Sequence, residues 1–192
     1  MIKTFSGKPV AQRAAELSRL IEILKENDVT KYLEIGSRYG DTFHEIMRNL
    51  PPSSTGVAVD MVAGPWGRSD SREYLEAAVN DLIEKGYNAS CVFGNSTSSA
   101  TKQLITHRCH TYDCVFIDGD HQLEGLILDW INYGPLAKMV VFHDIDGRGK
   151  KDSVTKAPVD VPYVWDILKS RYKHEEIICK KNRGMGIGVL WM

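Results

Sequence analysis

The stretch that decides the fold reads Leu33-Glu34-Ile35-Gly36-Ser37-Arg38-Tyr39-Gly40-Asp41-Thr42. A short strand, residues 32–36, ends in a turn with two glycines four residues apart, and helical periodicity begins at Asp41. Glycines at such a turn let the backbone approach a ligand closely. The turn contains neither G-x-G-x-x-G nor G-x-x-x-x-G-K-S/T. This disfavours a dinucleotide loop that binds pyrophosphate, and it disfavours a P-loop.

Short apolar runs and helical patterns alternate along the chain on both sides of this stretch. Apolar residues at three- and four-residue steps predict helices over 9–27, 41–50, 71–85, 97–107, 123–131 and 161–172. Strands are predicted over 32–36, 56–60, 89–93, 114–117, 138–143, 175–179 and 186–191. The apolar strands suit a parallel sheet covered on both faces, and the last two strands, joined by a turn at 181–184, predict an antiparallel hairpin.

This alternation predicts an α/β fold with a doubly wound, mostly parallel seven-stranded sheet and a C-terminal antiparallel hairpin, its antiparallel strand at the edge. The chain has 192 residues, 43% hydrophobic and 26% charged, which is typical of a single globular domain and excludes wholesale disorder. We expect residues 1–192 to form that one domain. An N-terminal helix lies within residues 1–30, and the polar stretch 144–160 forms a substrate loop.

Composition also limits which binding partners and which cellular compartment we expect. A net charge of −1 argues against a protein built mainly to bind nucleic acid. No apolar run approaches the roughly 18 residues of a membrane helix, and the N-terminus lacks the apolar core of a signal peptide. Four cysteines without a C-x-x-C pair predict reduced thiols in a cytoplasmic protein. The cluster of His107, Cys109, His110 and Cys114 leaves a zinc site as an alternative to a simple loop.

Polar residues follow the predicted strands, at the sheet edge where open α/β sheets bind ligands. The carboxylate of Asp60 can accept hydrogen bonds from both hydroxyls of a ribose. Asn95 and Ser96 offer polar groups to an adenine edge, although Ser96 or Thr97 could equally cap the next helix. Glu34 and Asp41 place negative charge around the glycine turn, which suits a cationic ligand better than a phosphate.

Residues 33–42, Asp60 and the run Phe116-Ile117-Asp118-Gly119-Asp120-His121 together resemble the class I S-adenosylmethionine-dependent methyltransferases. Within that class they are most similar to the small-molecule O-methyltransferase branch that includes macrolide-sugar and cephalosporin-tailoring enzymes. The resemblance covers about residues 31–144 and extends to the terminal hairpin. It implies a Rossmann-like fold and a set of cofactor-binding residues: Glu34, Gly36, Ser37, Gly40, Thr42, Asp60, Asn95, Ser96 and Asp118.

The resemblance also implies the residues at the reacting end. Asp118 and Asp144 correspond to Mg²⁺ ligands, and His121 corresponds to the general base. His143, a second candidate catalytic residue, stands where the branch usually has Glu. Because oxygen ligands suit Mg²⁺ and Mn²⁺, this departure leaves open magnesium, manganese, a softer metal or no metal at all.

The expected function is transfer of the methyl group of S-adenosylmethionine to a hydroxyl of a small-molecule acceptor such as a sugar. A histidine with an ordinary pKa near 6.5 can take the hydroxyl proton near neutral pH. Trp66 and the lysine-rich loop 144–159 are expected to close over the acceptor. Two alternatives stay open: a methyltransferase-like binding domain without catalysis, and a nicotinamide-dependent oxidoreductase. Neither a membrane nor a nucleic-acid partner is expected, and the oligomeric state is not predicted.

Overall fold

The central sheet has seven strands in the order β3-β2-β1-β4-β5-β7-β6. The computed structural model describes residues 4–7, 12–65, 67, 70–179 and 185–192. The strands are β1 (Lys31–Ile35), β2 (Thr55–Asp60), β3 (Asn88–Phe93), β4 (Tyr112–Ile117), β5 (Ala137–His143), β6 (Lys173–Ile177) and β7 (Ile187–Trp191). The helices are α1 (Ala14–Glu26), α2 (Asp41–Met47), α3 (Ser71–Glu84), α4 (Ser99–Arg108), α5 (Leu123–Tyr133) and α6 (Val161–Lys169), with a short 3₁₀ turn at Gly134–Leu136.

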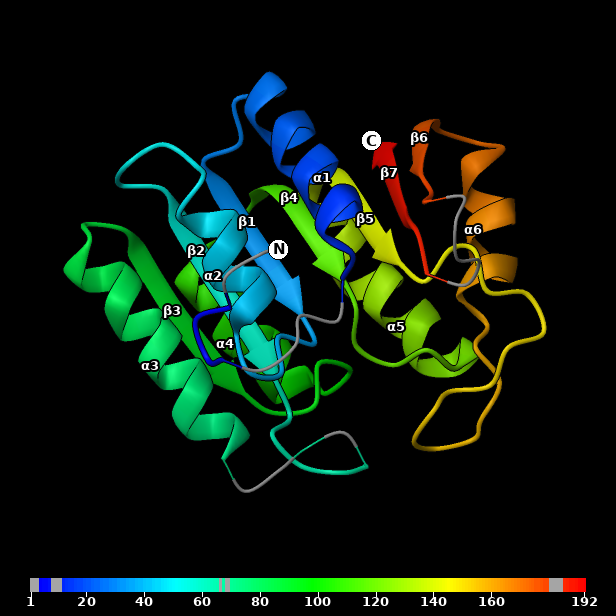
Figure 1. Cartoon of the computed structure of the whole chain (residues 1–192), viewed down its shortest axis with the longest axis horizontal. Coiled ribbons are helices and arrows are strands. Elements are labelled where there is room, and N and C mark those ends of the chain that lie inside the picture. Colours follow the sequence, from blue (N-terminus) through cyan, green and yellow to red (C-terminus); the bar gives the residue numbers. More distant parts are fainter. Residues whose placement is uncertain (1–3, 8–11, 66, 68–69, 180–184) are drawn as a thin grey trace.

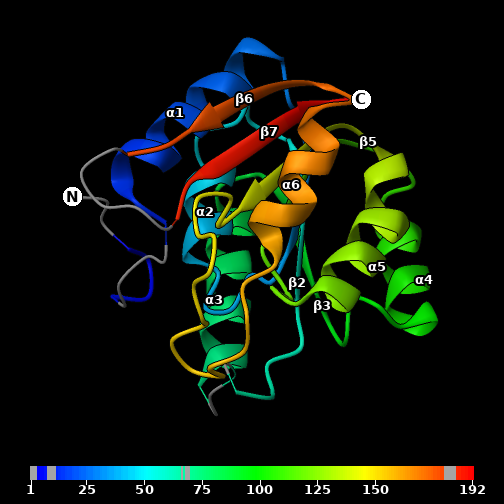
Figure 2. The same cartoon turned by 90° about the vertical axis from the view of Figure 1, so that its right-hand side faces the viewer.

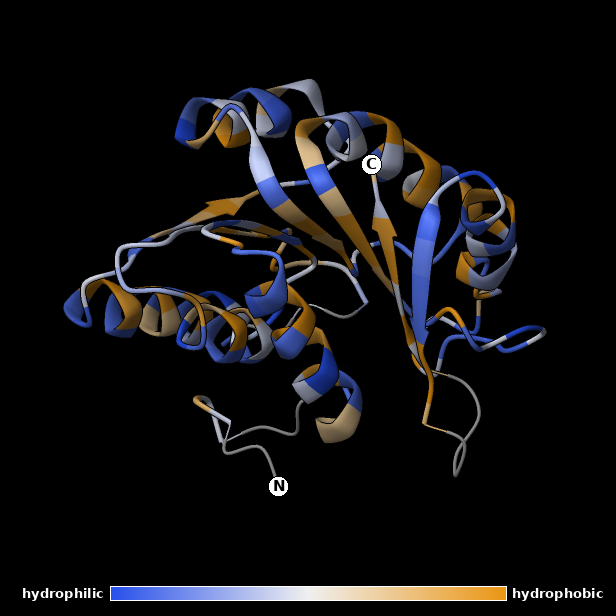
Figure 3. Cartoon of the chain, turned by 90° about the horizontal axis from the view of Figure 1, so that it is seen from above, coloured by the Kyte–Doolittle hydropathy of each residue, from blue (hydrophilic) through white to orange (hydrophobic). Residues whose placement is uncertain are grey.

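Helices cover both faces of the sheet, so the molecule has three layers. Helices α1, α2 and α3 lie on one face, and α4, α5 and α6 lie on the other (Figures 1 and 2). Because side chains alternate along a strand, Phe116 and Val141 join the core under the first layer, whereas Val115 and Val140 join the core under the second. The central strands are accordingly apolar on both faces, and much of their length is coloured as hydrophobic in Figure 3.

The predicted fold class is confirmed, with one difference in the hairpin. Strands β1 to β5 are parallel, and β7 is antiparallel to both of its neighbours. The sequence analysis expects the antiparallel strand at the edge, but β7 lies between β5 and β6. The edge is β6, whose sequence KHEEI is charged. Charged side chains at an edge strand oppose pairing with another chain.

Several element boundaries differ from the prediction. Helix α1 begins at Ala14 rather than at Pro9, which lies outside the described residues. Helix α4 is capped by Ser98, whose hydroxyl accepts the Thr101 N–H at 3.2 Å, and not by Ser96 or Thr97. Among the elements described, no helix combines the length and the apolar character required to span a bilayer.

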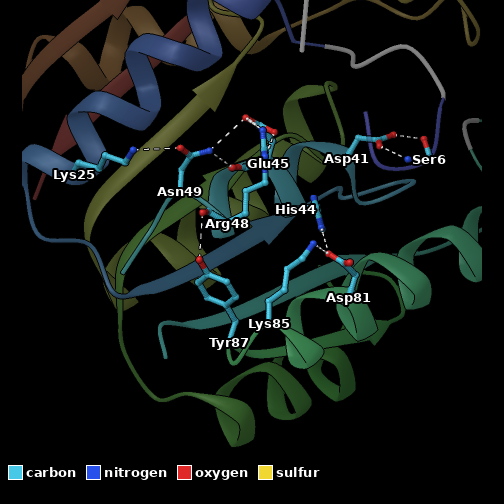
Figure 4. A network of polar contacts seen from close by, with 10 residues as sticks. All are labelled: Ser6, Lys25, Asp41, His44, Glu45, Arg48, Asn49, Asp81, Lys85 and Tyr87. Atoms are coloured by element: carbon cyan, nitrogen blue, oxygen red, sulfur yellow. Dashed lines mark hydrogen bonds and ion pairs between the residues drawn. The ribbon is translucent and has the colours of Figure 1, made fainter. Parts of the chain in front are cut away.

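A polar network joins α2 to α3 and to the N-terminal segment (Figure 4). His44 Nε2 lies 2.5 Å from Asp81 Oδ2, and Lys85 binds the same carboxylate oxygen. The backbone N–H of Ser6 donates to Asp41 Oδ1 at 2.8 Å. These contacts hold the first turn of α2, and with it the glycine turn, against the rest of the first layer.

Candidate functional site

A pocket of about 830 Å³ opens at the carboxyl ends of the parallel strands. The loops that follow β1, β2, β3, β4 and β5 all contribute to its walls. Strand β1 pairs with β2 on one side and with β4 on the other, so the strand order reverses between β1 and β4. This reversal is where open α/β sheets bind ligands, as the sequence analysis expects.

Close packing around the Cα atoms of both glycines of the turn explains why glycine is needed there. Gly36 has φ +90°, and a Cβ at this position would lie 2.1 Å from the carbonyl oxygen of Asp118. Gly40 has φ +80°, and its Cβ would lie 2.8 Å from a methyl carbon of Leu75. The ends of β1 and β4 therefore touch through their backbones, which only glycine permits at Gly36.

Asp60 lines the pocket wall at the end of β2. Its Oδ2 accepts the backbone N–H of Arg38 at 2.6 Å, and its Oδ1 accepts that of Val62 at 2.6 Å. Each carboxylate oxygen has a second lone pair, so both oxygens keep capacity for ligand hydroxyls. The two backbone bonds fix the carboxylate at the pocket edge.

Asn95 and Ser96 also lie on the pocket wall, and both are held by hydrogen bonds. The side-chain oxygen of Asn95 accepts the Thr97 N–H at 3.0 Å, so this bond uses the oxygen and not the NH₂ group of the amide. The carbonyl of Ser96 accepts the hydroxyl of Tyr133 at 2.6 Å. The turn after β3 is thus preformed.

The charge of the glycine turn differs from the prediction. Glu34 is 2% exposed and accepts the hydroxyl of Tyr32 at 2.7 Å. Burial raises the pKa of Glu34 to about 8, so this side chain is largely neutral at pH 7. Asp41 is turned toward Ser6. The structure therefore corrects the view that Glu34 supplies charge to the turn.

Two histidines and two aspartates meet where β4 and β5 end. His143 Nδ1 lies 3.1 Å from Asp118 Oδ1 and 3.5 Å from Asp144 Oδ1. His121 Nε2 lies 3.4 Å from Asp118 Oδ1, and its Nδ1 lies 3.6 Å from Asp144 Oδ2. All four residues line the pocket, so the structure brings the candidate reacting residues together.

The four groups shift one another's pKa values. Burial would raise the pKa of Asp118, but the adjacent His143 and His121 hold it well below its usual value. Burial would lower the pKa of His143, but the ionised Asp118 raises it to about 9. Burial would lower the pKa of His121, but its hydrogen bond to Asp118 together with the charges of Asp118 and Asp144 raises it. Asp118 and His143 therefore form a buried ion pair.

This arrangement does not fit a divalent cation. Among the described residues, no group of three or more His, Cys, Asp or Glu side chains is placed to hold a metal ion. Asp118 Oδ2 accepts the Gln12 amide at 2.6 Å, and its Oδ1 faces both histidines. The metal site expected at Asp118 and Asp144 is therefore not supported. The alternative zinc site is not supported either, because Cys114 is buried whereas His107 and His110 are exposed.

The predicted substrate loop is an ordered segment bound to the reacting end. Within it Lys151 and Pro158 form a β-bridge, and Asp152 Oδ1 accepts the Thr155 N–H at 2.6 Å. The N–H of Asp160 donates to the carbonyl of His121 at 2.8 Å. The loop and the candidate base are thereby joined. Trp66, expected to close the pocket, lies outside the described residues.

Gln12 is a pocket residue that the sequence analysis missed. Gln12 is 5% exposed, lines the pocket and bonds to both Thr42 and Asp118. No motif surrounds it, and it falls inside the helix that the apolar pattern predicts.

Comparison with known proteins agrees with this architecture. No family model and no curated protein matches the sequence. An O-methyltransferase from Bacillus cereus, solved with S-adenosylhomocysteine, has TM-score 0.67 and 12% identity over 97% of this chain and 86% of its own. TomG from Streptomyces achromogenes, an O-methyltransferase of tomaymycin synthesis solved with S-adenosylmethionine, has TM-score 0.66 and 18% identity over 98% and 84%. The chain has a Rossmann-like methyltransferase fold. The methyltransferase domain of bacterial CtHen1 is also similar, with TM-score 0.63 and 12% identity over 93% of this chain and 97% of that domain.

At these identities the similarity establishes the fold of the chain. None of the three structures singles out the macrolide-sugar or cephalosporin-tailoring branch, which stays a prediction.

Proposed function

We propose that the protein transfers the methyl group of S-adenosylmethionine to a hydroxyl of a small molecule, a sugar among the candidates. One observation carries this proposal. A single pocket joins a wall suited to a nucleoside, formed by Asp60 and the turn at Asn95, to a cluster in which His121 lies between Asp118 and Asp144.

The nucleoside wall fits S-adenosylmethionine better than it fits a dinucleotide. Asp60 would bind the ribose hydroxyls, and Asn95 with Ser96 would face the adenine. The methionine part would extend along Gly36, Ser37, Gly40 and Thr42. The carboxylate of Asp118 lies beyond this turn, and it can accept hydrogen bonds but has none to donate to a phosphate.

When bound, S-adenosylmethionine supplies a methyl group activated by a positively charged sulfur. His121 would accept the proton of the acceptor hydroxyl, since it lines the pocket. Asp118 and Asp144 flank the ring nitrogens and orient it. His143, 4% exposed, is the counter-charge that keeps Asp118 ionised, which makes it a positioning residue rather than a second base. No step in this scheme passes through a metal.

The proposal is tested by binding and turnover on the purified chain. We expect S-adenosylmethionine to bind by calorimetry and methyl transfer to occur in a panel of hydroxylated acceptors. His121→Ala should keep cofactor affinity and slow transfer about 10²–10⁴-fold, and His110→Ala, an exposed histidine, serves as the control. Dialysis against a chelator should leave turnover unchanged.

Three results would contradict the proposal. Binding of S-adenosylmethionine without transfer to any acceptor would favour a binding domain without catalysis. Binding of NADH with none of S-adenosylmethionine would favour an oxidoreductase. Normal turnover of His121→Ala would place the base elsewhere.

A further inference from the structure

The two helical layers differ in how much apolar surface they leave exposed. Among the described residues, the helices of the second layer expose seven large apolar side chains: Leu104, Leu123, Ile127, Leu128, Ile131, Tyr163 and Ile167. On the helices of the first layer, within the same described part of the chain, Ile83 alone is comparably exposed. Single apolar side chains are ordinary on a protein surface, whereas a gathered set marks an interaction surface.

Five of these side chains form a strip across two helices, which we call the apolar strip: Leu123, Ile127 and Ile131 on α5, and Tyr163 and Ile167 on α6. Within each helix they recur at four-residue steps, so they share one face. Helices α5 and α6 are neighbours, because side chains of both pack against Phe142 of β5 (Figure 2). The strip lies outside the residues that line the pocket, so the pocket does not account for it.

The apolar strip is surrounded by little charge. Asp129 is the only charged residue between Glu124 and Lys138, and it is fully buried. On α6, the charge of Asp166 is matched by Lys169, whose Nζ lies 2.8 Å from Asp166 Oδ1. Covering the strip therefore removes few charges from water. A partner must present an uncharged apolar surface of similar size, and a second copy of this chain presents one.

Two charged side chains at opposite ends of α5 fit the same partner. Glu124 lies exposed in the first turn of α5 and has no ion-pair partner among the described residues. Near the last turn, Lys102 of α4 donates to Asn132 Oδ1 at 3.1 Å and has no carboxylate partner in that part of the chain. A two-fold axis across the middle of α5 sets two copies of this helix antiparallel. Glu124 then approaches the partner's Lys102, and the symmetry forms this pair twice.

We propose that the chain forms a symmetric dimer through the apolar strip, with the two α5 helices antiparallel. The dimer does not depend on the function proposed above. Three helices about 15 Å long and about 10 Å apart offer on the order of 500 Å² per copy. A specific interface of that size is small, so the expected dissociation constant is in the micromolar range.

Sedimentation velocity of the full chain, at concentrations from about 1 to 200 µM, tests the dimer. The wild type should be monomeric at the lowest concentration and mainly dimeric at the highest. Ile131→Lys, at a position 57% exposed, places a charge in the strip and should raise the dissociation constant more than about 10-fold. The matched control is Ile83→Lys on α3, at a position 51% exposed, which should leave the dissociation constant within about two-fold.

Exchange of the two charges tests the antiparallel arrangement. Glu124→Lys should raise the dissociation constant about 3- to 10-fold, since two exposed ion pairs are lost. Adding Lys102→Glu to that variant should restore the dimer. A double variant as weak as the single one would overturn the arrangement.

Three results would overturn the dimer itself. The wild type would stay monomeric at every concentration, or the dimer would survive Ile131→Lys, or Ile83→Lys would weaken it equally. Circular dichroism checks that each variant folds. If Ile131→Lys does not fold, Ile167→Lys, at a position 59% exposed on α6, repeats the comparison.

Discussion

Asp118 is the residue that connects the two ends of the pocket. One carboxylate oxygen faces the first helical layer through Gln12, and the other faces the histidine pair. The buried carboxylate keeps its charge because His143 lies 3.1 Å away. A buried charge with several hydrogen bonds is a strongly held group, so Asp118 fixes the geometry on both sides.

Asp60 should contribute directly to cofactor affinity. Asp60→Asn keeps one acceptor for the backbone N–H of Arg38 or Val62 but weakens bonding to ribose hydroxyls. We expect binding of S-adenosylhomocysteine to weaken by about 1–3 kcal/mol, the usual effect of an unpaired buried polar group. Calorimetry measures the change, and unchanged affinity would remove Asp60 from the ribose role.

The raised pKa of His121 predicts the pH dependence of turnover. A general base must be unprotonated, and the carboxylate of Asp118 raises this pKa above 6.5 despite burial. The rate should therefore rise with pH through a midpoint above that of a free histidine. The positive sulfur of a bound cofactor opposes protonation and should lower the midpoint in the complex. The profile of kcat/KM for S-adenosylmethionine across pH 5–10 reports the free enzyme, and a midpoint there at or below that of a free histidine would contradict this assignment.

The site was predictable where a residue follows a strand. Asp60, Asp118, His121 and Asp144 each follow an apolar run, so the parallel topology alone brings them to one edge. The position of Gln12 in the pocket was not predictable, because its contact with Asp118 spans 106 residues. The neutral state of Glu34 depends on burial that no local pattern records.

At the scale of elements, the contact between β1 and β4 depends on Gly36. Gly36→Ala would place a Cβ 2.1 Å from the Asp118 carbonyl oxygen at φ +90°. We expect the free energy of unfolding to fall by about 2–5 kcal/mol from backbone strain and overpacking combined. Gly86→Ala is the matched control, since Gly86 has φ +89° with no atom within 4 Å of its Cβ. Chemical denaturation should show only about 1–2 kcal/mol of strain for Gly86→Ala, and equal losses would refute the packing argument.

The elements themselves were largely predictable, because the strands are apolar on both faces and the helices are periodic. The position of β7 was not, since pairing with β5 rather than with an outer edge is decided by long-range contacts. The start of α1 was misplaced because Val10 and Ala14 continue the apolar spacing, although the helix begins only at Ala14.

At the scale of the whole molecule, the pocket draws residues from Gln12 to Met185. A ligand that touches so many segments must stabilise the chain as a unit. At a concentration about 100 times its dissociation constant, a ligand adds about 2.7 kcal/mol. For a domain of this size, we expect S-adenosylhomocysteine to raise the melting temperature by roughly 5–10 °C. Thermal shift measures this, with NADH as the comparison; a shift by NADH alone would contradict the cofactor assignment.

Strand β7 has a hydrogen-bonded neighbour along each side, whereas β6 has one. Four of its five residues are buried, against one of five in β6. In deuterated solvent, the amide hydrogens of β7 are therefore shielded from both directions, and they will be among the last in the chain to be replaced. Those of β6, adjacent in space and equally extended, will exchange early.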